Sequence, residues 1–102
     1  MRVPIACTLT AERAADRVEE WRLALGDAVT HMSRPEPTRL VMRVGSDTAQ
    51  IAILVELARR EKQCCEFFDF AFQVGADDVT FEVSVPEDAI AVLDGFAELP
   101  SQ

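Results

Sequence analysis

Apolar side chains alternate with polar or small ones over two neighbouring stretches in the carboxyl-terminal half of the chain. Residues 68–74 and 79–85 each place every second, apolar side chain on one face, and the segment 75–78 between them reads Gly-Ala-Asp-Asp. Alternation with a period of two is typical of a strand that is buried on one face, and Gly and Asp favour tight turns. The pattern predicts a β-hairpin.

Apolar residues with helical spacing occupy two longer stretches. The first covers about residues 11–25, and Gly26 is its expected carboxyl-terminal stop. The second covers about residues 48–65 and follows Asp47, a good N-cap residue. Trp21 falls within the apolar stripe of the first helix, so we interpret it as a core anchor rather than as a platform for a ligand.

The remaining elements complete an α+β fold. Shorter alternating segments predict strands at residues 2–9, 28–33 and 38–44, a proline-containing turn at 34–37, and a last helix after Pro86. The predicted order is βαββαββα, an antiparallel-rich sheet with helices on one face, and its first six elements have the order of a ferredoxin-like fold. We expect a single domain over residues 1–99 and a tail at 100–102.

Composition narrows the classes of partner. The chain has 102 residues and a formal net charge of −8, with 18 acidic against 10 Lys and Arg residues. Nucleic acid and anionic membrane surfaces are therefore disfavoured partners, because both require a basic face. The chain has neither an apolar span nor a signal-peptide pattern, which predicts a cytoplasmic protein with reduced thiols. The last two elements are candidates for mediating a homodimer.

Three cysteines are the main candidates for chemistry. Cys64 and Cys65 lie at the end of the second helix, and Cys7 lies on the buried side of the first predicted strand. In a ferredoxin-like topology these two places are at the same end of the domain, so we expect the three thiols to converge. Thiolates bind soft metals and metalloids, and Glu61 and His31 are candidate additional ligands. The odd number of cysteines argues against a disulfide framework.

The same cysteines admit other interpretations. Cysteine often behaves as a small core residue, and the positions of Cys7 and Cys65 on apolar faces suit that role. Cys64 has no comparable packing reason. A structural or partner-binding domain, redox chemistry and a cysteine-dependent enzyme therefore stay open beside metal binding. Among enzymes, an organomercury-cleaving reaction with two thiols and a carboxylate fits the residues best.

The segment from Arg60 to Phe68, Arg-Glu-Lys-Gln-Cys-Cys-Glu-Phe-Phe, resembles a group of small bacterial proteins of unassigned function. They carry Glu-x-x-Cys-Cys-x-Phe before a β-hairpin, and the segments 7–9 and 20–22 look like the first part of the same group. Its members often accompany metal-resistance genes or MerR-type regulators. The resemblance implies a role in handling mercury, arsenite or a similar thiophile. The residue after the cysteine pair is often Pro in the group, whereas it is Glu66 here.

Overall fold

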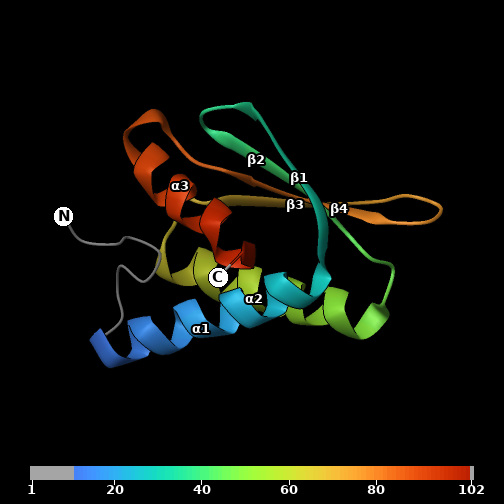
Figure 1. Ribbon diagram of the computed structural model, residues 1–102. Helices are drawn as coiled ribbons and strands as arrows, with labels where there is room; N and C mark the ends of the chain where they lie inside the picture. Colours follow the sequence, from blue (N-terminus) through green and yellow to red (C-terminus); the bar gives the residue numbers. More distant parts are fainter. Residues whose placement is uncertain (1–10, 102) are drawn as a thin grey trace.

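Three helices and a four-stranded sheet make up the fold in the computed structural model, which describes the backbone of residues 11–101 and the side chains of residues 15–100 (Figure 1). The elements are α1 (Ala11–Ala28), β1 (Val29–Glu36), β2 (Arg39–Val44), α2 (Thr48–Cys64), β3 (Asp69–Val74), β4 (Val79–Ser84), the 3-10 turn η2 (Glu87–Ala89), α3 (Ile90–Glu98) and the 3-10 turn η3 (Leu99–Ser101). The α+β class is confirmed. The predicted strand at residues 2–9 lies outside the described residues.

The sheet is antiparallel throughout, in the order β1-β2-β4-β3. The predicted hairpin is confirmed as β3–β4, with Phe72 opposite Phe81. The ferredoxin-like pairing is not what the described strands adopt. That topology would place the segment 2–9 in the interior of the sheet beside residues 68–74, whereas β4 fills this position and pairs with β2 on its other side.

One face of the sheet and the inner sides of the helices form the core. Along β2 and β4 every second residue is buried, from Leu40 to Val44 and from Val79 to Val83. Trp21 of α1 is fully buried and stacks on Phe81 at a ring distance of 6.1 Å, and it meets Phe96 of α3 edge-on at 4.9 Å. Its predicted role as a core anchor is therefore confirmed. All three helices cover the same face of the sheet.

Two predicted boundaries are wrong for reasons that lie in the tertiary structure. The helix α1 continues through Gly26 to Ala28, because Leu25 and Ala28 are both buried and their packing outweighs the poor helix propensity of glycine. The strand β1 continues through Pro35, since an edge strand with a register shift between Ser33 and Glu36 tolerates a residue without an N–H group.

Within the described part of the chain, no helix is long and apolar enough to cross a membrane.

Candidate thiol site at the end of helix α2

The cysteine pair lies where α2 ends and the chain turns into β3. Asp47 caps the start of this helix by accepting a hydrogen bond from the backbone N–H of Gln50 at 3.1 Å. Cys64 is the last helical residue, and Cys65 is the C-cap, in an extended conformation. The Cys65 N–H donates to the carbonyl of Glu61 at 2.7 Å, which closes the last turn. The helix therefore begins at the predicted residue and ends, as predicted, at the cysteine pair.

Lys62 fixes the path of the chain after the cysteines. Its Nζ donates to the carbonyl oxygens of Glu66 at 2.8 Å and Phe68 at 2.7 Å, and it contacts a carboxylate oxygen of Asp69 at 3.3 Å. A cation in the last turn also interacts favourably with the negative end of the helix dipole. The turn that carries Cys65 is therefore held by the contacts of the Lys62 side chain.

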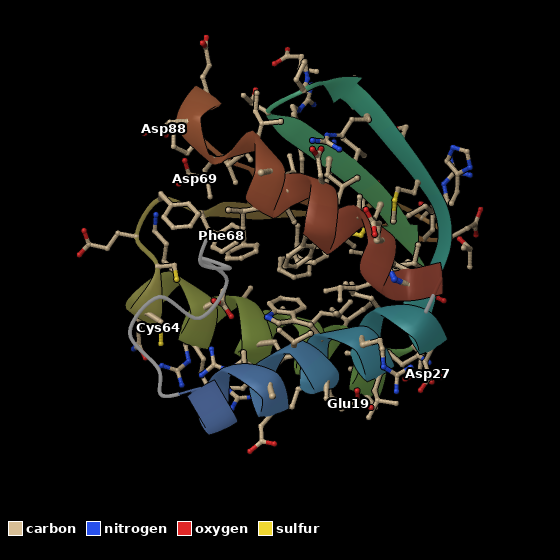
Figure 2. All side chains as sticks on the ribbon, turned by 60° about the vertical axis from the view of Figure 1, so that its left-hand side comes forward. Glu19, Asp27, Cys64, Phe68, Asp69 and Asp88 are labelled. Carbon is tan, nitrogen blue, oxygen red and sulfur yellow. The ribbon has the colours of Figure 1, made fainter. Side chains whose placement is uncertain are left out.

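The two cysteines of the pair differ in burial and in chemical state. The side chain of Cys65 is 1% exposed and packs in the core, and its sulfur is disulfide-bonded. Cys64 is part-buried and carries a thiol, and Figure 2 shows its side chain at the carboxyl-terminal end of α2. The predicted division into a core-facing Cys65 and a more accessible Cys64 is confirmed. The expectation that every thiol is reduced is wrong for Cys65. Cys7 lies outside the described residues.

A buried carboxyl lies one helical turn before the cysteines. The Glu61 side chain is fully buried, and its Oε1 accepts hydrogen bonds from Arg17 Nη1 at 3.1 Å and from Trp21 Nε1 at 3.0 Å. Arg17 is itself only 8% exposed, so this is a buried ion pair between α1 and α2. Among the described residues, no group hydrogen-bonds the second oxygen, Oε2, which is also buried. A buried acceptor without a hydrogen bond lowers the stability of the fold, so its presence calls for an explanation such as a functional role.

Burial has the largest effect on the pKa of the Glu61 carboxyl. Removal from water raises the pKa of Glu61, and the hydrogen bonds from Trp21 and Arg17, with the charges of Arg17 and Arg60, lower it by a smaller amount. The net shift is upward from the ordinary value of 4.5. Glu61 therefore retains a proton at a higher pH than an exposed glutamate does. It precedes a cysteine pair whose thiols would release protons on binding an electrophile.

Helix spacing brings Glu61 to the cysteines, whereas His31 is elsewhere. Residues three and four positions apart lie on one helix face, so Glu61 adjoins both Cys64 and Cys65. His31 is an exposed residue of β1, opposite Arg43. Because β1 and β3 are the two outer strands, about 14 Å of sheet separates that strand from the one that follows the cysteines. The predicted ligands Glu61, Cys64 and Cys65 therefore follow one another within about one turn of α2, whereas His31 lies apart from them.

The partners of Glu61 were not anticipated from the sequence. Arg17 and Trp21 precede Glu61 by 44 and 40 residues, so only the packing of α1 against α2 reveals them. One local signal exists, because Glu61 follows Leu57 and Ala58 at helical spacing and so interrupts the buried stripe of α2 with an acid. Within the described part of the chain, no cluster of three or more His, Cys, Asp or Glu side chains is arranged to hold a metal ion.

No family model, curated protein or solved structure matches this chain. The function is therefore inferred from the site itself.

Proposed function

We propose that the protein in its reduced state binds a thiophilic metal ion or metalloid, such as Hg(II) or As(III), through Cys64 and Cys65. The observation that carries this proposal is the juxtaposition, at the end of α2, of a part-buried thiol, a second cysteine sulfur and a buried carboxyl whose Oε2 lacks a hydrogen bond from the described residues. Cys7 is the candidate third ligand. The binding module would act in the cytoplasm, where thiols are kept reduced.

Ligand softness favours thiophiles over harder cations at this position. Thiolates prefer soft, low-coordinate ions, and a coordinating thiol loses its proton even where the protein does not make it acidic. The end of a helix does not make a thiol acidic, because the dipole there is negative. Glu61 adds a single oxygen donor that could serve as a further ligand. A site with so few oxygen donors is unsuited to Mg²⁺ or Ca²⁺.

Native mass spectrometry of the reduced protein tests this proposal. The protein is titrated separately with Hg(II), As(III), Cu(I) and Zn(II), and we expect a 1:1 adduct with at least one of the soft species. The Cys64→Ala, Cys65→Ala double variant should form no adduct, while Cys7→Ala shows whether a third thiol contributes. Retained thermal unfolding of each variant controls for folding. Absence of any adduct, or an adduct that survives in the double variant, contradicts the proposal.

The buried carboxyl also favours a second candidate, an enzyme that cleaves organomercurials. In such a reaction two thiolates take up the mercury, and a carboxylic acid donates its proton to the carbon that leaves. Glu61 is the candidate acid, because it lies three and four residues before the two cysteines. Native mass spectrometry of the reduced protein with phenylmercury distinguishes the binding module from the enzyme. An adduct that retains the phenyl group supports binding alone, and an adduct of mercury without it, with release of benzene, supports the enzyme.

A further inference from the structure

Among the four strands that the structure describes, the two outer ones differ in how they are protected from pairing with another chain. The strand β1 has two register shifts and contains Arg34 and Pro35, all of which discourage a further strand. The strand β3 pairs with β4 without a shift and has neither proline nor a basic residue. Its sequence is Asp-Phe-Ala-Phe-Gln-Val. No other strand of residues 11–101 pairs with the outer edge of β3.

The hydrogen-bond pattern of the hairpin shows which amides of β3 face outward. The N–H of Gly75 donates to the carbonyl of Asp78 at 2.8 Å, and this pair continues the β3–β4 register. In an antiparallel ladder, pairs that exchange hydrogen bonds alternate with pairs that do not. The inward-facing amides are therefore those of the odd-numbered residues. The outward-facing ones belong to Phe70, Phe72 and Val74.

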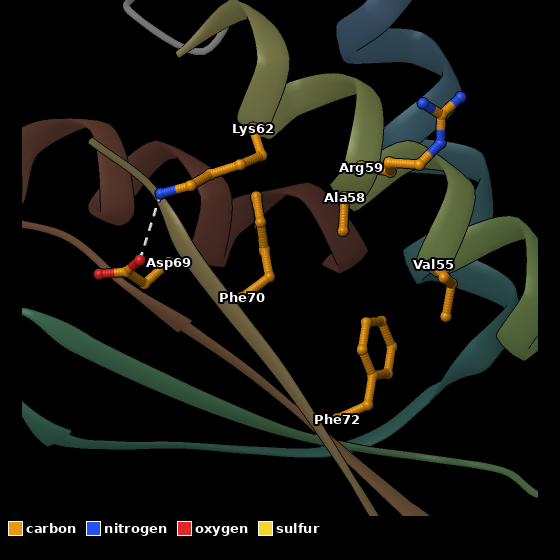
Figure 3. A pocket seen from close by; sticks show the side chains of 7 residues that line it. All are labelled: Val55, Ala58, Arg59, Lys62, Asp69, Phe70 and Phe72. Carbon is orange, nitrogen blue, oxygen red and sulfur yellow. Dashed lines mark hydrogen bonds and ion pairs between the residues drawn. The ribbon is translucent and has the colours of Figure 1, made fainter. Parts of the chain in front are cut away.

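The same three residues also place their side chains on the helix-covered face, beside a groove. The groove lies between α2 and β3 and has a volume of about 300 Å³ (Figure 3). Its apolar lining comes from Val55, Ala58, Phe70 and Phe72. Figure 3 shows Phe72 near Val55 at one end and Lys62 paired with Asp69 at the other.

Large apolar side chains stay exposed along this edge. Val74 is 80% exposed and Val55 is 45% exposed, the first just beyond the groove and the second in its wall. An unprotected strand with an apolar border is normally covered by another chain or by its own chain. Covering it would bury the two valines and complete the ladder.

We propose that β3 pairs with β3 of a second copy of this chain, antiparallel and around a two-fold axis at Phe72. The strand is self-complementary in that register, because Phe70 then lies opposite the second copy's Val74 on the same face of the sheet. The axis also places the end of the groove that carries Lys62 beside the second copy's turn at 75–78, which contains Asp77 and Asp78. Apolar groups then meet apolar groups, and the ion pair of Lys62 and Asp69 lies beside that turn.

Sedimentation velocity over a range of protein concentrations tests the proposal. The wild type should approach twice the chain mass of 11.3 kDa. Val74→Lys places a charge opposite Phe70 of the second copy without disturbing the monomer, and it should weaken association at least about tenfold. Leu23→Lys is the matched control, since Leu23 is 54% exposed on α1, away from the groove. Added salt should strengthen the dimer by screening the −8 charge on each copy.

Hydrogen exchange of individual amides gives the second readout. The N–H groups of Phe70, Phe72 and Val74 should be protected in the wild type and lose that protection on dilution. A wild type that stays monomeric overturns the proposal, and protection that is independent of concentration would indicate that the chain covers its own edge. The proposal would also be overturned if the Val74→Lys variant dimerised as tightly as the Leu23→Lys variant, because the interface would then lie elsewhere.

Discussion

Replacement of Glu61 by Ala is expected to lower the free energy of unfolding by about 3–5 kcal/mol, the usual cost of removing one partner of a buried ion pair. The variant leaves the Arg17 guanidinium buried without its carboxylate and the Trp21 N–H without an acceptor. A cavity adds to the loss. Chemical denaturation of wild type and variant in the same redox state measures the difference.

The matched control is Glu56→Ala on the same helix. Glu56 is exposed, and its carboxylate pairs with Arg59 at 2.7 Å on the surface, where solvent screens the interaction. This variant should unfold very close to wild type. If Glu61→Ala costs no more than Glu56→Ala, the buried network does not hold α1 against α2 in the way that the structure indicates.

Replacement of Glu61 by Gln separates the charge of this residue from its shape. Glutamine retains an oxygen for Arg17 and Trp21 but not the negative charge, so near neutral pH its cost should be smaller than that of Glu61→Ala. Because burial raises the pKa of Glu61, the folded protein binds more protons than the unfolded chain above the ordinary pKa of 4.5. The stability that this residue contributes is therefore present below that pH and falls as the pH rises through the folded pKa. The stability of Glu61→Gln relative to wild type should increase over the same range.

Reduction is expected to strengthen the binding of As(III) by about 10²–10⁴-fold, the gain that a second linked ligand usually provides. In the oxidised protein the Cys65 sulfur is held in a disulfide, so the cysteine pair offers only the thiol of Cys64. Reduction releases the sulfur of Cys65 beside it. Isothermal titration of the same preparation, before and after treatment with a phosphine reductant, measures the change.

Two variants control this comparison. Cys65→Ala removes the sulfur that is oxidised, so reduction should no longer change the affinity. Ser84→Ala replaces a residue of β4 that alternates with the buried side chains of this strand, and it should behave as wild type does. An oxidised wild type that binds As(III) as tightly as the reduced protein would show that Cys65 is not a ligand and that its role is structural.

The elements that local patterns specify strongly were predictable from the sequence. The β3–β4 hairpin follows from alternation around a Gly-Ala-Asp-Asp turn, and α2 follows from its cap at Asp47 and its apolar stripe. Strand order was not predictable in this way. Side-chain alternation shows that a strand is half-buried, but it does not show which strand lies beside it, so β4 could not be recognised as the neighbour of β2.

The site was predictable only in part, for a similar reason. Spacing along one helix placed Glu61 beside Cys64 and Cys65, and the apolar stripe placed Cys65 in the core. The burial of Glu61 depends on Arg17, a contact between distant segments that no local pattern encodes. The segment also lacks a local signal for the oxidation of Cys65, because disulfide formation depends on where a second sulfur lies in the fold.

Protection of thiols by phenylarsine oxide is the most direct test of a binding site formed by Cys64 and Cys65. This reagent joins two nearby thiols to one arsenic atom and releases water, so it reports a pair rather than a single reactive cysteine. One equivalent is added to the reduced protein, the remaining thiols are alkylated, and the modified peptides are identified by mass spectrometry. The account predicts that Cys64 and Cys65 are both protected, and that in a Cys7→Ala background, where these two are the only thiols, Cys64→Ala abolishes the protection of Cys65. Full alkylation of both cysteines in the presence of the arsenical would contradict it.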